Sequence, residues 1–242
     1  MIFSKHFFIS TLLGLSCSCL LHVSSAKEND YSSELIGDFE YLRPDLSTVP
    51  PVEMEIMQEN GPMRVSLVKP DPIGIEILLD SGDGSAIVFW EFMHEFQILF
   101  PRTEELNNAF QIGDPELRAE QLAPIINPLL PLASIPPDST NIHRLIDQYL
   151  RTLIEAKKWA EIYDVSDNMY LDLAPKSTIG HFFDAAENLF LKGDEKRATA
   201  LLNQLVAARP MEESKQVALD IAARFMEVRL SLPALRLYQT FA

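Results

Sequence analysis

The stretch from Ala186 to Pro210 reads AENLFLKGDEKRATALLNQLVAARP and has the clearest helical pattern in the chain. Two runs of apolar residues with helical spacing lie on either side of a Gly-Asp pair, and a proline closes the second run. Gly193 is suited to end the first helix, Asp194 to cap the second, and Pro210 to stop it. The stretch therefore predicts two antiparallel helices joined by a tight turn.

The unit around this hairpin, residues 179–210, resembles a tetratricopeptide repeat. Counted from Ile179, the residue types that characterise the repeat fall at Phe182, Ala185, Ala186, Leu189, Gly193, Ala198, Leu202, Leu205 and Pro210. The resemblance implies that small Ala186 and Ala198 lie where the two helices approach each other most closely. A larger side chain at either position would push the helices apart.

Two further units carry the same pattern less completely. The unit 215–242 begins 36 residues after the first and departs from the pattern at Arg229, where the repeat has glycine. The unit 141–172 has the rhythm of a hairpin, but Asp147 and Gln148 occupy two of its small-residue positions. An ordinary helical bundle, with alanines at close-packing positions and no repeat, is the alternative to a stack of repeats.

Helical spacing begins near Thr103 and continues to the end, so residues 103–242 are predicted to form helical hairpins. Asp114-Pro115 is a strong helix start, and the Gly-Asp before it resembles the turn of the main hairpin. Prolines at 124, 128, 131, 136 and 137 are expected to break the following segment into short pieces. The fold class that these patterns predict is mostly α, with an α-solenoid of tetratricopeptide-like hairpins after a small β meander.

Residues 52–102 precede the helices and predict this antiparallel meander. Apolar and polar residues alternate from Val52 to Ile56 and again after the turn sequence ENGP. A second pair of strands, 73–79 and 86–90, flanks DSGDGS, whose glycines suit a tight hairpin turn. Four short strands rarely form a stable domain alone, so their apolar face should pack against the helices that follow.

The amino terminus has the pattern of a secretory signal peptide, residues 1–26. A lysine precedes an apolar run from Phe7 to Leu21, which is shorter than the about 20 residues that span a bilayer. We therefore expect export to the periplasm or the extracellular space, with 27–51 as a largely irregular tether. A lipoprotein acylated at Cys17 or Cys19 is the alternative.

Charge and cysteine content narrow the classes of partner. The chain has 20 basic and 35 acidic residues, a formal net charge of −15, and signal removal would take away one lysine and no acid. This charge repels nucleic acids and anionic lipid, so neither is expected as a partner. Both cysteines lie in the predicted signal peptide, so we expect no disulfide after its removal. We also expect no membrane span in the chain that remains.

No catalytic, cofactor-binding or metal-binding residue is assigned, because no complete motif occurs. Glu91 and His94 have the spacing of half a di-metal motif, without a second copy. The sequence ILLDSGDGSA resembles the catalytic loop of retroviral-type aspartic proteases and would make Asp80 half of a two-chain dyad. A helical pattern begins about 20 residues later, where that fold requires more β structure.

The resemblance implies an exported, non-catalytic binding or scaffolding protein whose repeats present a surface to another polypeptide. In tetratricopeptide proteins a concave groove is lined by fixed positions of each first helix. In this chain those positions include Phe183, Glu187, Phe190, Leu219 and Met226. Such a groove favours an apolar or amphipathic segment, unless the chain's own β meander already covers it.

Three other interpretations remain open from the sequence. The last helix has no polar capping helix after it, so we expect a partner or a second copy of the chain to cover it, unless the repeat array continues beyond Ala242 in a longer protein. The chain could also serve as an accessory subunit of an envelope enzyme or transport assembly. The third interpretation is the aspartic protease with Asp80.

Overall fold

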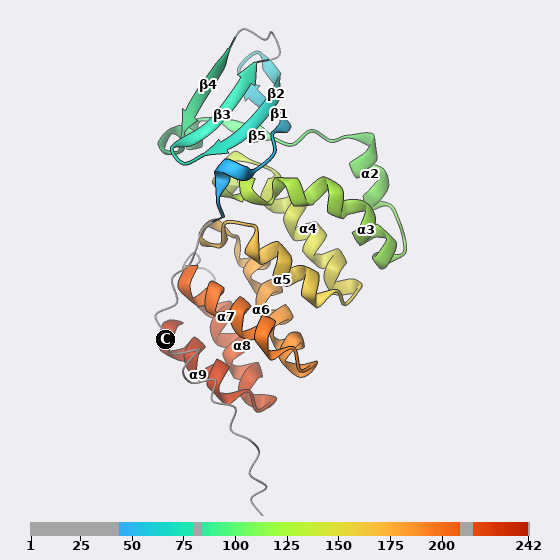
Figure 1. Cartoon of the computed structure of the whole chain (residues 1–242), viewed down its shortest axis with the longest axis vertical. Coiled ribbons are helices and arrows are strands. Elements are labelled where there is room, and N and C mark those ends of the chain that lie inside the picture. Colours follow the sequence, from blue (N-terminus) through green and yellow to red (C-terminus); the bar gives the residue numbers. More distant parts are fainter. Residues whose placement is uncertain (1–43, 80–83, 209–214, 242) are drawn as a thin grey trace, which may run out of the picture. The chain divides into compact units, whose positions relative to one another are not determined.

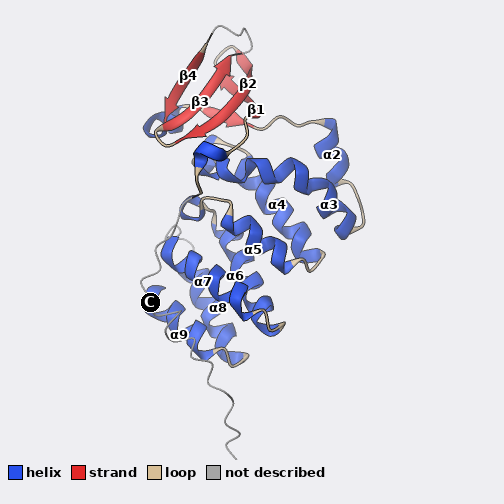
Figure 2. Cartoon of the chain, viewed as in Figure 1, coloured by secondary structure: helices blue, strands red, loops and turns tan. Residues whose placement is uncertain are grey.

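The structure is a computed structural model that describes residues 44–79, 84–208 and 215–241, all within one structural unit, Tyr31–Ala242. Most of these residues are helical, and one small antiparallel sheet precedes the α-helices in the chain (Figure 1; Figure 2). This confirms the predicted class at the level of a mostly helical chain with a small sheet before the helices. The predicted signal peptide, most of the tether and Asp80 lie outside the described residues.

The sheet has five strands in the order β4-β3-β2-β1-β5, and all neighbours are antiparallel. The strands are β1 (Val52–Gln58), β2 (Gly61–Asp71), β3 (Gly74–Leu79), β4 (Ser85–Phe89) and β5 (Gln97–Leu99). The first four match the predicted strands. The fifth was not predicted, because its three residues are too few to show a period of two and it follows a 3-10 helix, η2 (Trp90–Glu95).

One face of the sheet is apolar and packs into a core that it shares with the helices. Val52, Met54 and Ile56 alternate with exposed or half-buried residues along β1, as the period of two predicts. Val65 on β2 and Ile75 on β3 are completely buried and belong to the same continuous core as the helical residues. The expectation that the meander lies on the helices is therefore confirmed.

Asn141 links the end of the sheet to the start of a helix. Its side-chain amide donates to the carbonyl of Phe100 and accepts from the Phe100 N–H, both at 2.8 Å. The hydroxyl of the neighbouring Thr140 accepts from the Ile142 N–H at 3.3 Å, at the start of the same helix. Asn141 thus connects Phe100, just after the last strand, to the start of a helix 41 residues later.

Part of the predicted tether packs against the sheet, at β2. A short 3-10 helix, η1 (Leu46–Thr48), begins after Asp45, whose carboxylate accepts from the Ser47 N–H at 2.9 Å. Leu46 and Val49 are buried. Residues 44–51 are thus irregular apart from η1, but Leu46 and Val49 hold the segment against the rest of the chain.

Eight α-helices follow the sheet in the described residues. They are α2 (Glu104–Phe110), α3 (Pro115–Ile126), α4 (Ile142–Glu155), α5 (Trp159–Asp167), α6 (Lys176–Leu191), α7 (Glu195–Ala208), α8 (Lys215–Glu227) and α9 (Ser231–Phe241). Short 3-10 helices connect some of them: η3 (Asn127–Ser134), η4 (Pro137–Ser139) and η5 (Leu171–Leu173). Asp114 caps α3 with its side chain, as predicted, and Thr103 caps α2 in the same way.

The prolines of the middle segment break it later than expected. Pro124 lies inside α3, which continues to Ile126, so the predicted break at Pro124 is wrong. Pro128 and Pro131 lie within the single 3-10 helix η3. Four apolar side chains of η3 are buried, which compensates for the hydrogen bonds that proline cannot donate.

The helices pack in antiparallel pairs, and successive pairs lie side by side (Figure 1). α4 pairs with α5, α6 with α7, and α8 with α9. Between pairs, α4 contacts α6 and α6 contacts α8. In the same way α5 contacts α7 and α7 contacts α9. Each hairpin therefore places its first helix on the next first helix, and its second helix on the next second helix.

The turns inside these three hairpins are copies of one another at intervals of 36 residues. Lys157, Gly193 and Arg229 each adopt a left-handed conformation, with φ of 55°, 81° and 65°. The next amide in each turn donates back to the carbonyl five residues earlier: Lys158 to Leu153, Asp194 to Leu189 and Leu230 to Phe225, at 2.9, 2.9 and 2.8 Å. This bond is the signature of a Schellman helix end.

The turns also correct the register of the earliest unit. Its predicted start is Asn141, but alignment on the left-handed residue begins it at His143. In that register Tyr149 and Leu150 take the places assigned to Asp147 and Gln148, and both are buried. The sequence misses this register because the two residues are large where the resemblance calls for small ones.

The turn conformation gives a stability prediction with opposite signs at two positions. Arg229→Gly should raise the free energy of unfolding by about 0.5–1 kcal/mol, because a side chain disfavours positive φ. Gly193→Ala should lower it by about 1 kcal/mol, and the effect comes from the backbone alone, since an added Cβ would meet no atom within 4 Å. Urea denaturation of the two variants tests this, and two changes of the same sign would contradict it.

Candidate protein-interaction site

Phe183, the first of the predicted partner-binding residues, lies in the core. It is on α6, which packs against α4, α5, α7 and α8, and its side chain is 0 % exposed. No partner can contact Phe183 while α6 remains packed, so its assignment to a groove is corrected. The repeat pattern predicts which face of α6 it occupies, but not how completely the neighbouring helices cover that face.

Glu187 is also buried, and it ties α6 to α8. Its carboxylate accepts a hydrogen bond from the guanidinium of Arg224, and the same guanidinium donates to Asp184 at 2.6 Å. Burial raises the pKa of Glu187, and the positive charge of Arg224 opposes that shift. The predicted acidic group of the groove is thus already neutralised by the chain itself.

The other three predicted residues differ in exposure. Phe190 is half-buried and packs edge to face against Phe225, with ring centroids 6.1 Å apart. Leu219 is half-buried, and Met226 is 51 % exposed. Of the five predicted residues, Met226 alone is mostly available to a partner.

A second charged cluster ties α4 to α6. The Nε2 of His181 lies 3.3 Å from Oδ1 of Asp147, and Arg151 donates to Oδ2 of Asp147 at 2.9 Å. Burial would raise the pKa of Asp147, but interactions with His181, Ser177 and Arg151 outweigh burial and hold the pKa at about 2. The helix face expected to be an apolar groove therefore carries polar contacts between successive hairpins, and those of Arg224 are ion pairs.

Asp147 predicts how stability depends on pH. Because its folded pKa of about 2 lies below the ordinary value of 3.8, ionised Asp147 stabilises the fold above about pH 4, and this contribution disappears as pH falls toward 2. Asp147→Asn should lower the free energy of unfolding by about 2 kcal/mol at pH 7 and by progressively less below pH 4. Urea denaturation between pH 7 and pH 3 measures the difference. Asp220→Asn controls for net charge, and a difference independent of pH would contradict the assignment.

The last hairpin leaves an apolar surface uncovered, which we call the end face. It is formed by Ala223 and Met226 on α8 with Leu235 and Tyr238 on α9. Met226 is 51 % exposed, Leu235 is 50 % exposed and Tyr238 is 36 % exposed. In Figure 1, α8 and α9 form the last pair in the series of stacked hairpins.

The same positions are covered in the preceding hairpin. The residues 36 positions before the end face are Glu187, Phe190, Thr199 and Leu202. Glu187, Thr199 and Leu202 are 7 %, 4 % and 0 % exposed, and Phe190 is half-buried. In that hairpin the next helix pair provides the cover, since α8 contacts α6 and α9 contacts α7. The end face therefore occupies positions that, in the preceding hairpin, are covered by the next helix pair.

Sequence reasoning found only part of the end face. The sequence pattern assigns Met226 to a binding surface and favours association through the last helix, but it gives no binding role to Leu235 or Tyr238. The signal was present, because both residues are large and apolar at positions that a following hairpin would cover. To recognise this signal, one must know which positions face the next hairpin and which face the other helix of the same hairpin.

Glu91 and His94, which have the spacing of half a di-metal motif, lie on the 3-10 helix η2, and both are exposed. His94 and Glu95 are exposed and 3.7 Å apart, and no group of three or more His, Cys, Asp or Glu there could hold a metal ion. His143 is buried, with Nε2 2.7 Å from the Ile135 carbonyl, and burial lowers its pKa although that hydrogen bond opposes the shift. Trp90 donates to the carbonyls of Asp71 and Pro72 at 3.2 Å, and its indole packs against the core.

Comparisons with known proteins return no relative. No protein-family model matches the chain, and neither a curated protein nor a solved structure is similar to it. Among the described residues, no helix is both long and apolar enough to cross a membrane. Inferences about function therefore depend on the geometry of this chain.

Proposed function

We propose that this chain is an exported, non-catalytic binding or scaffolding protein built from tetratricopeptide-like hairpins. The main support is the end face, an apolar surface at positions that are covered by a helix pair in the preceding hairpin. The 36-residue recurrence of the turns at Lys157, Gly193 and Arg229 supports the repeat character of the hairpins. Export is proposed from the signal-like sequence of residues 1–26.

The partner that fits the end face is an amphipathic helical segment of another polypeptide. The surface is apolar at its centre, and exposed Asp220 and Glu227 flank it on α8. Arg224 is already occupied by Asp184 and Glu187. We therefore propose a partner helix with apolar residues at i, i+3 and i+4 and basic residues at its edges.

A role as accessory subunit of an envelope assembly is compatible with the same surface, because such a subunit would also work by binding a polypeptide. Self-association is a second way to cover the end face. Binding of another polypeptide and self-association differ in which molecule covers the end face. The size of the purified chain in solution separates them, because only self-association gives a dimer or larger oligomer of the chain alone. Neither role requires a catalytic residue.

The experiment compares two matched substitutions in the tagged chain, purified from the cells that produce it. Leu235→Glu places a charge in the end face, whereas Leu117→Glu places one at a 47 % exposed position on α3, outside it. We expect one polypeptide, or a second copy of the chain, to be retained by the wild type and by Leu117→Glu and lost by Leu235→Glu. Equal retention by both variants, with unchanged circular dichroism, would contradict the proposal.

A further inference from the structure

A cavity of about 680 Å³ lies away from the end face, between the segment 44–50, α3 with η3, and α5. This volume is in the range of small-ligand sites. Prolines and other apolar residues form much of its wall, among them Pro44, Pro131 and Val165. The cavity can therefore hold an alkyl chain against apolar walls.

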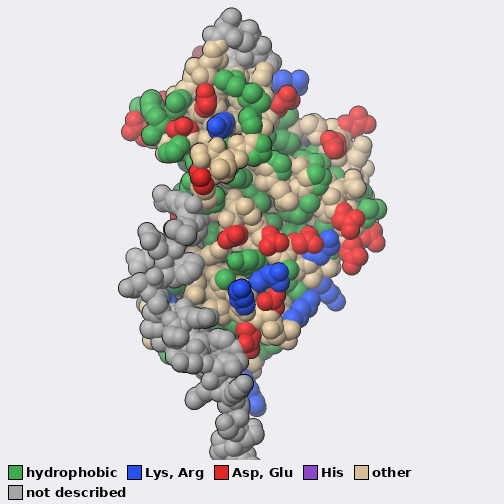
Figure 3. Space-filling model, viewed as in Figure 1, with side chains coloured by type: hydrophobic (Ala, Val, Ile, Leu, Met, Phe, Trp, Pro, Cys, Tyr) green, Lys and Arg blue, Asp and Glu red, His purple; other side chains and the backbone are tan. Residues whose placement is uncertain are grey.

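The charged residues that line the cavity are all acidic among the described residues: Asp45, Glu161, Asp164 and Asp167. Figure 3 shows a row of acidic side chains over α5. Some of them have partners nearby: Lys158 lies 3.0 Å from Glu161, and Gln204 donates to Asp167 at 2.8 Å. The negative charge of the cavity wall favours a cationic ligand.

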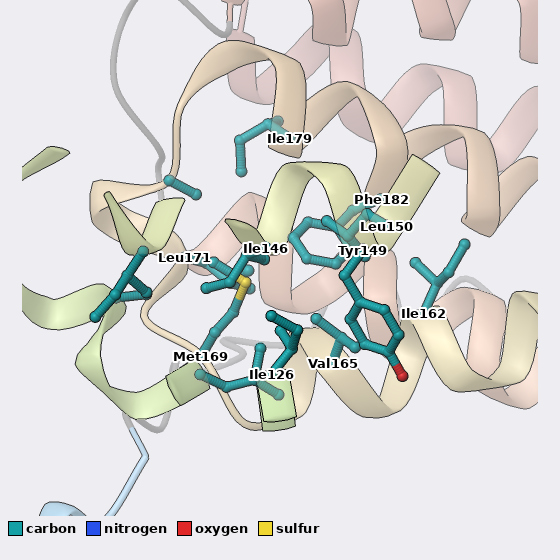
Figure 4. Close-up of a cluster of buried hydrophobic side chains, with 14 of the residues drawn as sticks. Ile126, Ile146, Tyr149, Leu150, Ile162, Val165, Met169, Leu171, Ile179 and Phe182 are labelled. Carbon is teal, nitrogen blue, oxygen red and sulfur yellow. The ribbon is translucent and has the colours of Figure 1, made fainter. Parts of the chain in front are cut away.

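Tyr149 provides a second, independent indication of a ligand. Its ring belongs to the core with Ile126, Ile146 and Leu150, and the side chain is 2 % exposed (Figure 4). Figure 4 shows the hydroxyl at the outer end of this cluster, and the residue lines the cavity.

No hydrogen bond joins the Tyr149 hydroxyl to another described residue, and this hydroxyl is the polar end of a side chain that is 2 % exposed and lines the cavity. Burial, with the negative charges of Glu161 and Asp164, raises the pKa of Tyr149 to about 12. The hydroxyl therefore stays protonated and neutral at physiological pH. An unpaired neutral hydroxyl beside carboxylates can accept a hydrogen bond from a cation and donate one to a carboxylate.

We propose that this cavity binds a protonated alkyl amine, whose ammonium group lies between the Tyr149 hydroxyl and the carboxylates of Glu161 and Asp164. The alkyl chain would lie along the proline-rich wall. The amine could come from a free polyamine or from a lysine side chain of a polypeptide, since both present an ammonium group on an alkyl chain. This inference does not depend on the end face or on the proposed function.

Isothermal titration calorimetry of the purified chain tests it, with spermidine and N-acetyl-lysine amide as probes. We expect saturable one-to-one binding of at least one probe. Asp164→Asn should weaken binding by about tenfold or more, and Tyr149→Phe by several-fold, because each removes a group that contacts the ammonium. Asp220→Asn is the control, since it removes the same charge from an exposed position on α8.

The outcomes separate the alternatives. Tighter binding of spermidine identifies a free polyamine as the source, and tighter binding of the lysine derivative identifies a polypeptide side chain. Equal weakening by Asp164→Asn and Asp220→Asn would show only general attraction to an acidic chain and would overturn the proposal. Absence of saturable binding of both probes at millimolar concentration would overturn it as well.

Discussion

Phe183→Ala is expected to lower the free energy of unfolding by about 3–5 kcal/mol, because it removes a completely buried aromatic ring and leaves a cavity. The ring lies on α6, in the middle hairpin, where helices from both adjacent pairs pack. Since neighbouring hairpins support each other, the loss should appear as one cooperative unfolding transition at a lower urea concentration.

The matched control for this prediction is Met226→Ala on the end face. Met226 is 51 % exposed, so its truncation should change the free energy of unfolding by less than about 0.5 kcal/mol. A Phe183→Ala variant as stable as Met226→Ala would mean that Phe183 is not packed as described. In that case the original assignment of Phe183 to a binding groove would have to be restored.

Ala198→Leu should destabilise the chain by about 1–3 kcal/mol through overpacking. Ala198 is completely buried at the start of α7, at the position where α6 and α7 are expected to approach most closely. The equivalent residues in the flanking hairpins are Ile162 and Ala234, both buried. A small residue is therefore not required at this position in every hairpin, only where the facing helix leaves no room.

Ala200→Leu on the same helix is the comparison for Ala198→Leu. Ala200 is half-buried, so a larger side chain there can extend toward solvent, and we expect little change in the urea midpoint. If both variants unfold at the same midpoint as the wild type, α6 and α7 do not approach each other closely at Ala198. That result would remove a main physical reason for the alanines in this hairpin.

Local signals in the sequence predicted the helical part of the fold well. Thr103 and Asp114 cap helices with their own side chains, as their residue types indicate, and Gly193 adopts the left-handed conformation expected at a helix end. The strands of the meander follow from a period of two that spans several residues. Each of these signals depends on residues close together in the chain, which is why sequence alone can show it.

Other features depend on contacts between distant residues and could not be predicted in the same way. Lys157 and Arg229 adopt the glycine-like conformation without being glycine, so the residue type conceals the repeated turn. Strand β5 is defined by its pairing with β1, not by its own three residues. The burial of Phe183 and the exposure of Leu235 both depend on whether another hairpin lies against that face.

The cavity beside Tyr149 is a similar case. Its acidic residues come from α5 and from the segment before the sheet, and no spacing in the sequence brings Asp45 near Asp164. Tyr149 itself reads as an ordinary core residue of α4, because its hydroxyl shows no pattern along the chain. Such a site becomes visible only when the packing of the segment 44–50 is known.

Site-specific photo-crosslinking from the end face would show whether a polypeptide binds there. A photoreactive phenylalanine analogue would replace Leu235 in the wild-type chain and, in a second variant, Leu117 on α3, which is similarly exposed. Irradiation of the producing cells should yield one discrete crosslinked product from position 235, either to a partner polypeptide or to a second copy of the chain, and none from position 117. Absence of a discrete product at position 235, or the same products from both positions, would contradict the claim that α8 and α9 present a binding surface.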